Sequence, residues 1–272
     1  MRFIKDKRVR RRSIFCVSLL LGLTAVFFLV PESQRTDALL QAPSLAHPFG
    51  TDQLGRDMLV RSVHGFVYSF FIAFIINAVS FCLGNLLGVM IGYYGGWADR
   101  LYAYLLNLFM SIPMMIVFLT VLSMLGRGLL PIFFVLIFAD TLFRIRTAKN
   151  ETVVMKNSDY ILNLRILGAK DGQIILHHLL PHVWKLTFPL FAMLLGHIII
   201  SVSGLSFLGF GVQPPKADIG VLMKDALRFT QRAPWLMIFP GLFQVTIILI
   251  FNRWGEAIAR VTDLRKRKGG IR

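Results

Sequence analysis

The amino-acid sequence predicts an all-α polytopic membrane protein with six transmembrane helices. Of its 272 residues, 56% are hydrophobic, and the mean hydropathy is +0.65. Charged residues make up 16%, against roughly 25% in soluble domains, and they gather in short stretches between long apolar runs. A net charge of +16 would suggest nucleic acid in a water-soluble chain. Here the basic residues flank apolar segments, so orientation in a bilayer explains them and no nucleic-acid partner is expected.

Six apolar runs are the candidate transmembrane helices. A bilayer core of about 30 Å requires about 20 mainly apolar residues of helix. Five uncharged runs reach that length, and a sixth reaches it if one carboxylate, Asp140, is tolerated near its end. In chain order the runs cover residues 13–31, 62–98, 101–126, 128–143, 186–215 and 233–252. In three of the runs a proline is expected to bend or locally unwind its helix, because it lacks a backbone donor. These prolines are Pro113, Pro189 and Pro240.

The distribution of Lys and Arg predicts the orientation. Alternate connecting segments carry 22 and 8 of the 30 basic residues, and the richer set marks the cytoplasmic side. Both termini and the connection 144–185 are therefore expected in the cytoplasm, with the chain crossing the cell (plasma or inner) membrane several times. The first run also fits a cleaved secretory signal, but an uncleaved first helix fits the even number of spans. We expect three regions: a basic tail, first span and outer segment (1–61), a five-span domain (62–252) and a basic cytoplasmic tail (253–272).

Three glycines predict a close helix contact. Gly84, Gly88 and Gly92 recur every four residues and leave one helix face without side chains. Such a face favours tight packing within or between subunits. Glycine that is merely tolerated in a membrane helix is the alternative.

Polar groups inside the spans have either a structural role or a role in transport. Asp140 is the only carboxylate within a span, and a charge at mid-bilayer costs roughly 2.5–3.5 kcal/mol. Arg144 follows on the same helix face, so we expect an ion pair, with a polar pathway as the alternative. His197, together with Ser201 and Ser203, is either a contact for a cation or polar solute or a satisfied interior histidine.

No catalytic residue or metal site is predicted. The sequence lacks the GxxxxGK[ST], HExxH and GxSxG motifs, and it has no clustered carboxylates within its spans. Cys16 and Cys82 have no Cys or His neighbour at metal-site spacing. If the chain takes part in active transport, the energy must therefore enter from a partner.

The connection between the fourth and fifth spans predicts a helix, a sharp turn and a second helix. Apolar residues recur at helical spacing over 160–167, and Gly168 can end that helix. Asp171 can cap a second helix over 173–180, which Pro181 is expected to close. A folded inner loop of this shape favours docking of a cytoplasmic partner, and a merely solvated loop is the alternative.

This connection resembles the coupling loop of binding-protein-dependent ABC importer permeases, whose pattern is EAA, three residues, Gly, nine residues and IxLP. Gly168 occupies the glycine and residues 178–181 (HLLP) occupy the last four places. The first triplet departs from the pattern, because residues 162–164 (LNL) replace Glu, Ala and Ala and so remove an acidic side chain. The resemblance implies that the residues coupling the loop to an ATPase are Leu164, Gly168, Ala169, Lys170, Asp171, Gly172 and Pro181.

Three further stretches resemble the dipeptide, oligopeptide and nickel permeases of that family. They are HPFGTDQLGRDMLVRSVHG (47–65), YYGGWADR (93–100) and GLSFLGFGVQPPKADIGVLMKDA (204–226). The stretch LGHIIISVSGLSFLGFG (195–211) is most similar to the nickel and metallophore permeases. The resemblance therefore implies import of a nickel- or cobalt-type metal or metal chelate, with dipeptide or oligopeptide import as the alternative. A membrane-embedded enzyme or scaffold is the alternative from a different class.

The resemblance also implies partners. Six spans are few to enclose a solute path, so a second homologous permease subunit would complete it within the membrane lipid. Two ATP-binding subunits, which carry the ATP and magnesium, would dock at residues 168–173, and an extracellular solute-binding protein would deliver the solute. The chain itself would then hold no cofactor and no ATPase site.

Overall fold

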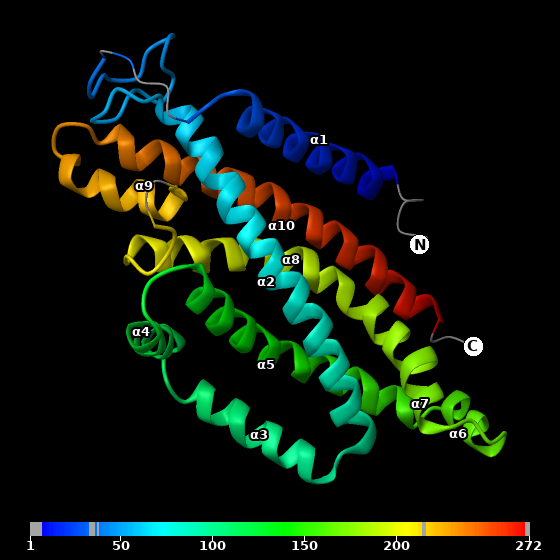
Figure 1. The fold of residues 1–272 in the computed structure, drawn as a ribbon. Helices are drawn as coiled ribbons and strands as arrows, with labels where there is room; N and C mark the ends of the chain where they lie inside the picture. The colour runs from blue at the N-terminus through cyan, green and yellow to red at the C-terminus, as the bar shows by residue number, and fades with distance from the viewer. Residues whose placement is uncertain (1–6, 33–35, 37, 214–215, 270–272) are drawn as a thin grey trace. The chain divides into compact units, whose positions relative to one another are not determined.

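The computed structural model describes residues 7–32, 36, 38–213 and 216–269, which form helices joined by turns and one isolated antiparallel bridge between Thr51 and Asp57. The predicted all-α class is confirmed for these residues. In chain order (Figure 1) the elements are α1 (Lys7–Leu29), α2 (Met58–Tyr94), α3 (Gly96–Met110), α4 (Met114–Leu125), α5 (Leu129–Lys156), α6 (Asp159–Ile166), α7 (Asp171–Gln173), the π-helix η2 (Ile174–Leu179), α8 (Leu180–Phe207), α9 (Ile219–Ala226), the 3-10 helix η3 (Leu227–Phe229) and α10 (Trp235–Gly269).

The described residues supply four to five candidate membrane spans rather than the six expected. Four helical stretches, 9–29, 58–94, 171–207 and 235–260, are long and apolar enough to cross a membrane, and α3 with α4 makes a fifth if this bent pair is one span. Helix α5 covers the remaining predicted run. It is not among the candidates because it carries Asp140, Arg144 and Arg146 close together.

Of the three span prolines, only Pro113 lies at a break between helices. Pro113 lies in the break between α3 and α4, whose axes differ in direction by 94°, as expected for a residue that lacks a backbone donor. Pro189 and Pro240 lie inside α8 and α10, and neither helix is unwound there. The expected unwinding therefore occurs only at Pro113.

The chain divides into two compact units. The first comprises Met1–Ile75, Gly126–Ile132 and Ala192–Arg272. Within it, α1 and α9 each pack against α10, as Figure 1 shows. Aromatic rings add to this packing, because the centroids of Phe70 on α2 and Phe251 on α10 lie 5.7 Å apart.

The second unit comprises Ile76–Leu125 and Phe133–Phe191. The end of α2 turns into α3 at two glycines, Gly95 and Gly96, whose φ values are +65° and +64°. A left-handed pair of this kind is accessible to glycine at little cost. Helix α3 then packs on α5 through a buried apolar cluster of Tyr102, Leu106, Leu142 and Ile145.

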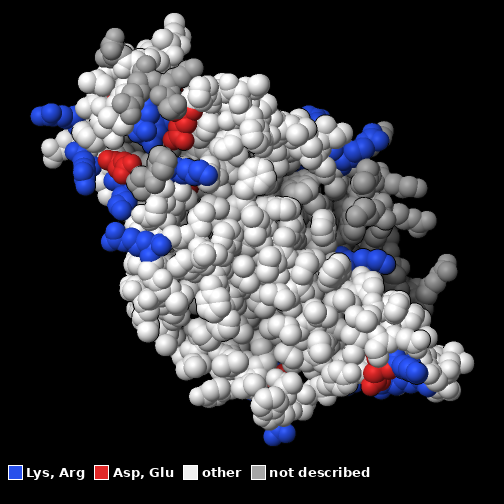
Figure 2. All heavy atoms as spheres, viewed as in Figure 1, with Lys and Arg blue, Asp and Glu red and all other residues white. Residues whose placement is uncertain are grey.

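On the face drawn in Figure 2, charged side chains gather in a few places. Most atoms on the face in Figure 2 belong to uncharged residues, while one group of acidic and basic side chains lies over the 38–57 segment and α9, and another lies over α6 and α7. This pattern fits a chain whose charged segments connect apolar helices.

Candidate functional site

The loop between α5 and α8, residues 156–182, is called the coupling loop below. Its first helix, α6, ends at Ile166, and Gly168 follows with a φ of +81°, which glycine adopts without strain. Two backbone hydrogen bonds of 3.0 Å close the turn, from Gly168 N to Arg165 O and from Ala169 N to Leu164 O. The structure therefore places a sharp turn at the predicted glycine.

The second helix of the coupling loop differs from the prediction. Lys170, not Asp171, is the N-cap residue, and its backbone N donates to Gln173 Oε1 at 3.1 Å. The helix also does not end at Pro181, because α7 runs through η2 into α8 as one helix over 171–207. Leu180 N donates to Ile175 O, five residues back. Pro181 is tolerated because its missing N–H falls where the π-helical pattern changes to the α-helical one.

The turn rests on a buried apolar cluster. The cluster unites side chains of α2, α5, α6, η2 and α8, and its members are Val89, Tyr93, Ala148, Ile161, Ile174, Ile175, Leu179 and Val183. Two of the predicted coupling residues, Leu164 and Ala169, pack against its edge. Displacing the turn would expose this cluster to water, so the turn is held in a fixed position on its helices.

The other side of the turn is exposed and partly apolar. Ile166 and Leu167 are each 81% exposed. The predicted coupling residues Lys170, Asp171 and Gly172 are exposed beside them. Exposed apolar side chains on an anchored turn are typical of a contact with another protein.

The glycine face of α2 packs on α5. A Cβ added at Gly84 would lie 2.5 Å from Arg144 Cβ, and one at Gly88 would lie 2.5 Å from Ala148 Cβ. At Gly92 the corresponding contact is Thr152 Cβ, at 2.9 Å. Both helices advance by four residues from contact to contact, so the glycines allow the two backbones to approach closely within this chain.

The buried Arg144 and the partly buried Asp140 form a polar group on the same contact. Arg144 Nε donates to Asp140 Oδ2 at 2.6 Å, and its Nη2 donates to Asn77 Oδ1. Asn77 Nδ2 in turn donates to Phe191 O at 2.9 Å. All of these partners belong to the second unit, and the geometry fits a role in joining α2, α5 and α8.

The three predicted pathway residues do not share one face. His197 is exposed, and Ser201 Oγ donates to its carbonyl oxygen at 3.1 Å. Ser203 is buried and accepts a hydrogen bond from Gln244 Nε2 at 2.9 Å. Its Oγ also lies 3.5 Å from Ser69 Oγ. Ser203 therefore lies where α2, α8 and α10 meet, and its side chain points in a different direction from that of Ser201, because two residues along a helix change the direction of a side chain by about half a turn.

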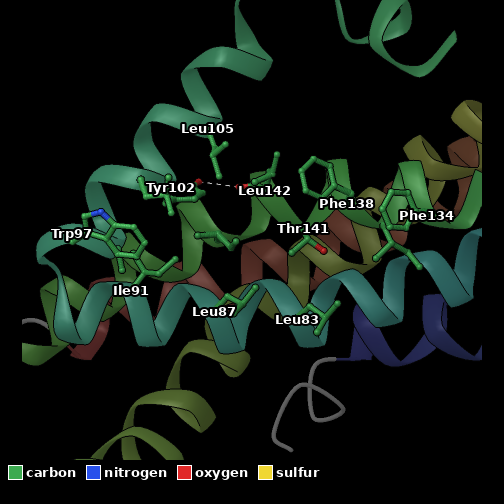
Figure 3. A pocket seen from close by; sticks show the side chains of 14 residues that line it. Leu83, Leu87, Ile91, Trp97, Tyr102, Leu105, Phe134, Phe138, Thr141 and Leu142 are labelled. Carbon is green, nitrogen blue, oxygen red and sulfur yellow. Dashed lines mark hydrogen bonds between the residues drawn. The ribbon is translucent and has the colours of Figure 1, made fainter. Parts of the chain in front are cut away.

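Helices α2, α3 and α5 of the second unit enclose an apolar groove of about 520 Å³ (Figure 3). Its wall is made mainly of aliphatic and aromatic side chains, including Leu83, Leu87, Ile91, Trp97, Leu105, Phe134 and Phe138. Tyr102 also lines it, but its hydroxyl donates to Leu142 O at 2.9 Å and so already has a partner. Thr141 also lines the groove, and its Oγ1 is buried without a hydrogen-bond partner. The lining is therefore predominantly apolar and suits hydrocarbon.

A network of ion pairs organises the segment between α1 and α2. Asp52 is buried, and its Oδ2 accepts from Arg56 Nε at 2.8 Å and from Arg61 Nη1 at 2.7 Å. Asp57 Oδ2 lies 2.7 Å from His47 Nδ1. Asp218 is the N-cap residue of α9 and accepts from Val221 N at 2.9 Å. These residues belong to the predicted 47–65 and 204–226 motifs and give a defined structure to 47–65 and to the start of α9.

Sequence reasoning missed several polar residues that the structure places at helix contacts. Asn77 and Gln244 are amides inside apolar runs, and that isolation was a usable signal, since a buried amide needs partners. Tyr93 lay inside the YYGG motif but had no assigned role.

Among the residues that the structure describes, no group of three or more His, Cys, Asp or Glu side chains is arranged to hold a metal ion.

Comparison with known proteins places these features in one family. Residues 84–263 match the model of the binding-protein-dependent transport system inner membrane component. The dipeptide transport system permease protein DppC of Alkalihalophilus pseudofirmus is 30% identical, over 82% of this chain and 74% of the relative. The glutathione transport system permease protein GsiD of Pectobacterium atrosepticum is 33% identical, over 84% and 75%. The oligopeptide transport system permease protein OppC of Mycobacterium tuberculosis is 30% identical, over 87% and 82%. The chain therefore belongs to the family of inner membrane components of binding-protein-dependent transport systems.

Proposed function

We propose that this chain is the permease subunit of an ATP-driven, binding-protein-dependent importer of short peptides. The family and the three relatives, named for dipeptide, glutathione and oligopeptide transport, support this cargo. The metal-chelate import expected from residues 195–211 is not supported by them. That expectation depended on one short stretch, whereas similarity to each of these relatives covers more than four fifths of the chain.

The single observation that carries the ATP-driven part is the exposed tip of the coupling loop. Ile166 and Leu167 project from a turn that a buried cluster holds in place. Relatives in this family are membrane components whose ATP is bound by separate subunits, and such a subunit would cover this tip. A contact of this kind transmits force well, because a rigid turn cannot absorb the movement of its partner.

The proposal includes the assembly and the orientation. A second homologous permease subunit completes the solute path, two ATP-binding subunits contact the coupling loop, and an external solute-binding protein supplies the peptide. Both termini and the coupling loop face the cytoplasm, as the excess of basic residues in these segments favours. Helix α5 serves as the sixth span, with Asp140 and Arg144 paired inside the protein.

The cargo is tested with the complete complex in proteoliposomes. Uptake of a labelled dipeptide, of glutathione and of a nickel–histidine chelate is measured with and without ATP. We expect ATP-dependent accumulation of the dipeptide or glutathione. Uptake of the nickel chelate alone would overturn the peptide cargo, and equal uptake without ATP would overturn the ATP-driven mechanism.

Docking is tested by the charge substitution Ile166→Asp. Burying an isoleucine side chain contributes roughly 1.5–3 kcal/mol, so its loss should weaken binding of the ATP-binding subunits by about tenfold or more. Val154→Asp is the matched control, since Val154 is 74% exposed and belongs to α5, outside the coupling loop. Binding is measured by titrating the ATP-binding subunits onto the permease. Equal affinities for the two variants would contradict the docking role.

A further inference from the structure

Tyr93, the penultimate residue of α2, contacts three elements of the second unit at once. Its hydroxyl donates to Asp171 Oδ1 on α7 at 2.5 Å. Arg165 Cζ on α6 lies 5.2 Å from the ring centroid, and Lys156 Nζ at the end of α5 lies 5.5 Å from it. Lys156 Nζ also donates to the Tyr93 carbonyl oxygen.

Tyr93 is buried, unlike the tyrosine that follows it in the chain. Tyr93 is 3% exposed within the cluster under the coupling loop, whereas its neighbour Tyr94 is 60% exposed. A phenylalanine would fill the same space and keep both cation–π contacts. Only the hydroxyl contacts Asp171, so packing alone does not explain why this position carries tyrosine instead of phenylalanine.

The helix that begins at Asp171 contains a π-helical segment. Between α7 and α8 lies the π-helix η2, residues Ile174–Leu179. A π-helical stretch is a rare departure from the α-helical ladder and is frequently found at functional sites. A displacement of the turn could therefore be taken up in η2 before it reached α8. The bond from Tyr93 to Asp171 lies before η2 and passes the displacement directly to α2.

We propose that the Tyr93 hydroxyl is the positioning contact that makes the coupling loop and α2 move together. This inference rests on the proposed function, in which an ATP-binding subunit displaces the coupling loop. Asp171 accepts the bond, while Lys156 and Arg165 hold the ring in place. Loss of the hydroxyl should leave docking intact, since Ile166 and Leu167 are unchanged, but should separate ATP hydrolysis from opening of the path.

The test uses Tyr93→Phe in the complete complex in proteoliposomes. A hydrogen bond to a charged group is one of the stronger contacts in proteins, so we expect peptide uptake per ATP hydrolysed to fall about tenfold, while ATP hydrolysis stays within about twofold. Asp171→Asn keeps an acceptor oxygen and should retain most of the coupling. Tyr93→Phe combined with Asp171→Ala should be no worse than either change alone, because the two groups act as one pair. Tyr94→Phe is the matched control and should behave as wild type.

A second readout does not depend on the cargo. Spin labels at Tyr94 and Leu162, both exposed, report the distance between the end of α2 and α6 through the ATP cycle. We expect one narrow distribution in the otherwise unchanged complex and a broader one with Tyr93→Phe. Wild-type uptake per ATP in Tyr93→Phe, or loss of ATP hydrolysis and uptake together, would overturn the inference, as would an unchanged distance distribution. Absent peptide uptake with the expected spin-label result would instead overturn only the proposed cargo.

Discussion

Substituting Gly88 by alanine tests the close packing of α2 on α5. An added Cβ would lie 2.5 Å from Ala148 Cβ and 2.9 Å from the Ile145 carbonyl oxygen. Carbon atoms in contact prefer about 3.5–4.0 Å, so the helices must separate by about 1 Å. Overpacking of this kind costs about 1–3 kcal/mol, while alanine regains about 0.5–1 kcal/mol from its better helix propensity. We expect a net loss of stability of up to about 2 kcal/mol.

The matched control is Gly204→Ala in α8, where an added Cβ meets no atom within 4 Å. That variant should show only the gain in propensity, so the difference between the two variants isolates the packing cost. The assay is the Tm of the purified protein in detergent, followed by the loss of monodisperse protein on heating. About 2–4 °C is expected for each kcal/mol in a chain of this size.

A second-site change sharpens the Gly88 test. Ala148→Gly in the Gly88→Ala background removes the Cβ contact but leaves the contact with the Ile145 carbonyl oxygen. We therefore expect partial recovery of the Tm. If Gly88→Ala and Gly204→Ala have the same Tm, or if Ala148→Gly gives no recovery, the two helices do not pack as described.

Two further predictions concern buried charges. Burial raises the pKa of Asp218 from 3.8 to about 6. The free energy of unfolding that the protonated carboxyl contributes is therefore fully present below pH 3.8 and is lost as the pH rises through about 6. The shift corresponds to a change of about 3 kcal/mol. Asp218→Asn keeps an oxygen that accepts from Val221 N but does not ionise, so this loss of stability should disappear. The check is the Tm measured from pH 4 to 7. A Tm that falls with pH as steeply as in the wild type would contradict the prediction. Asp140→Ala leaves the buried Arg144 without its carboxylate and should cost about 3–5 kcal/mol, measured by the same heating assay, with Asp140→Asn less damaging. Equal stability of Asp140→Ala and wild type would show that Arg144 does not depend on this pair.

Local physics made part of the candidate site predictable. Gly168 ends α6 because a left-handed residue is needed after the helix, and that need is visible in the sequence as a glycine after an apolar period. Asp171 was predicted to cap a helix because it precedes one in the sequence, but in the structure its carboxylate accepts a hydrogen bond from the Tyr93 hydroxyl. The partner lies 78 residues away along the chain, and no periodicity connects the two.

Three features followed from the sequence alone, through the hydrophobic effect and the local conformational preferences of helices. The chain is built of apolar helices, Gly84, Gly88 and Gly92 leave one face of a helix without side chains, and a turn forms at Gly168. These features depend only on neighbours in the chain. Which surface meets the bare face, and whether Pro181 ends a helix, were decided only by the tertiary structure. Both depend on atoms that folding brings together from distant parts of the sequence: the side chains of α5 that fill the space beside the glycines, and the buried cluster against which the π-helix packs as it runs into α8.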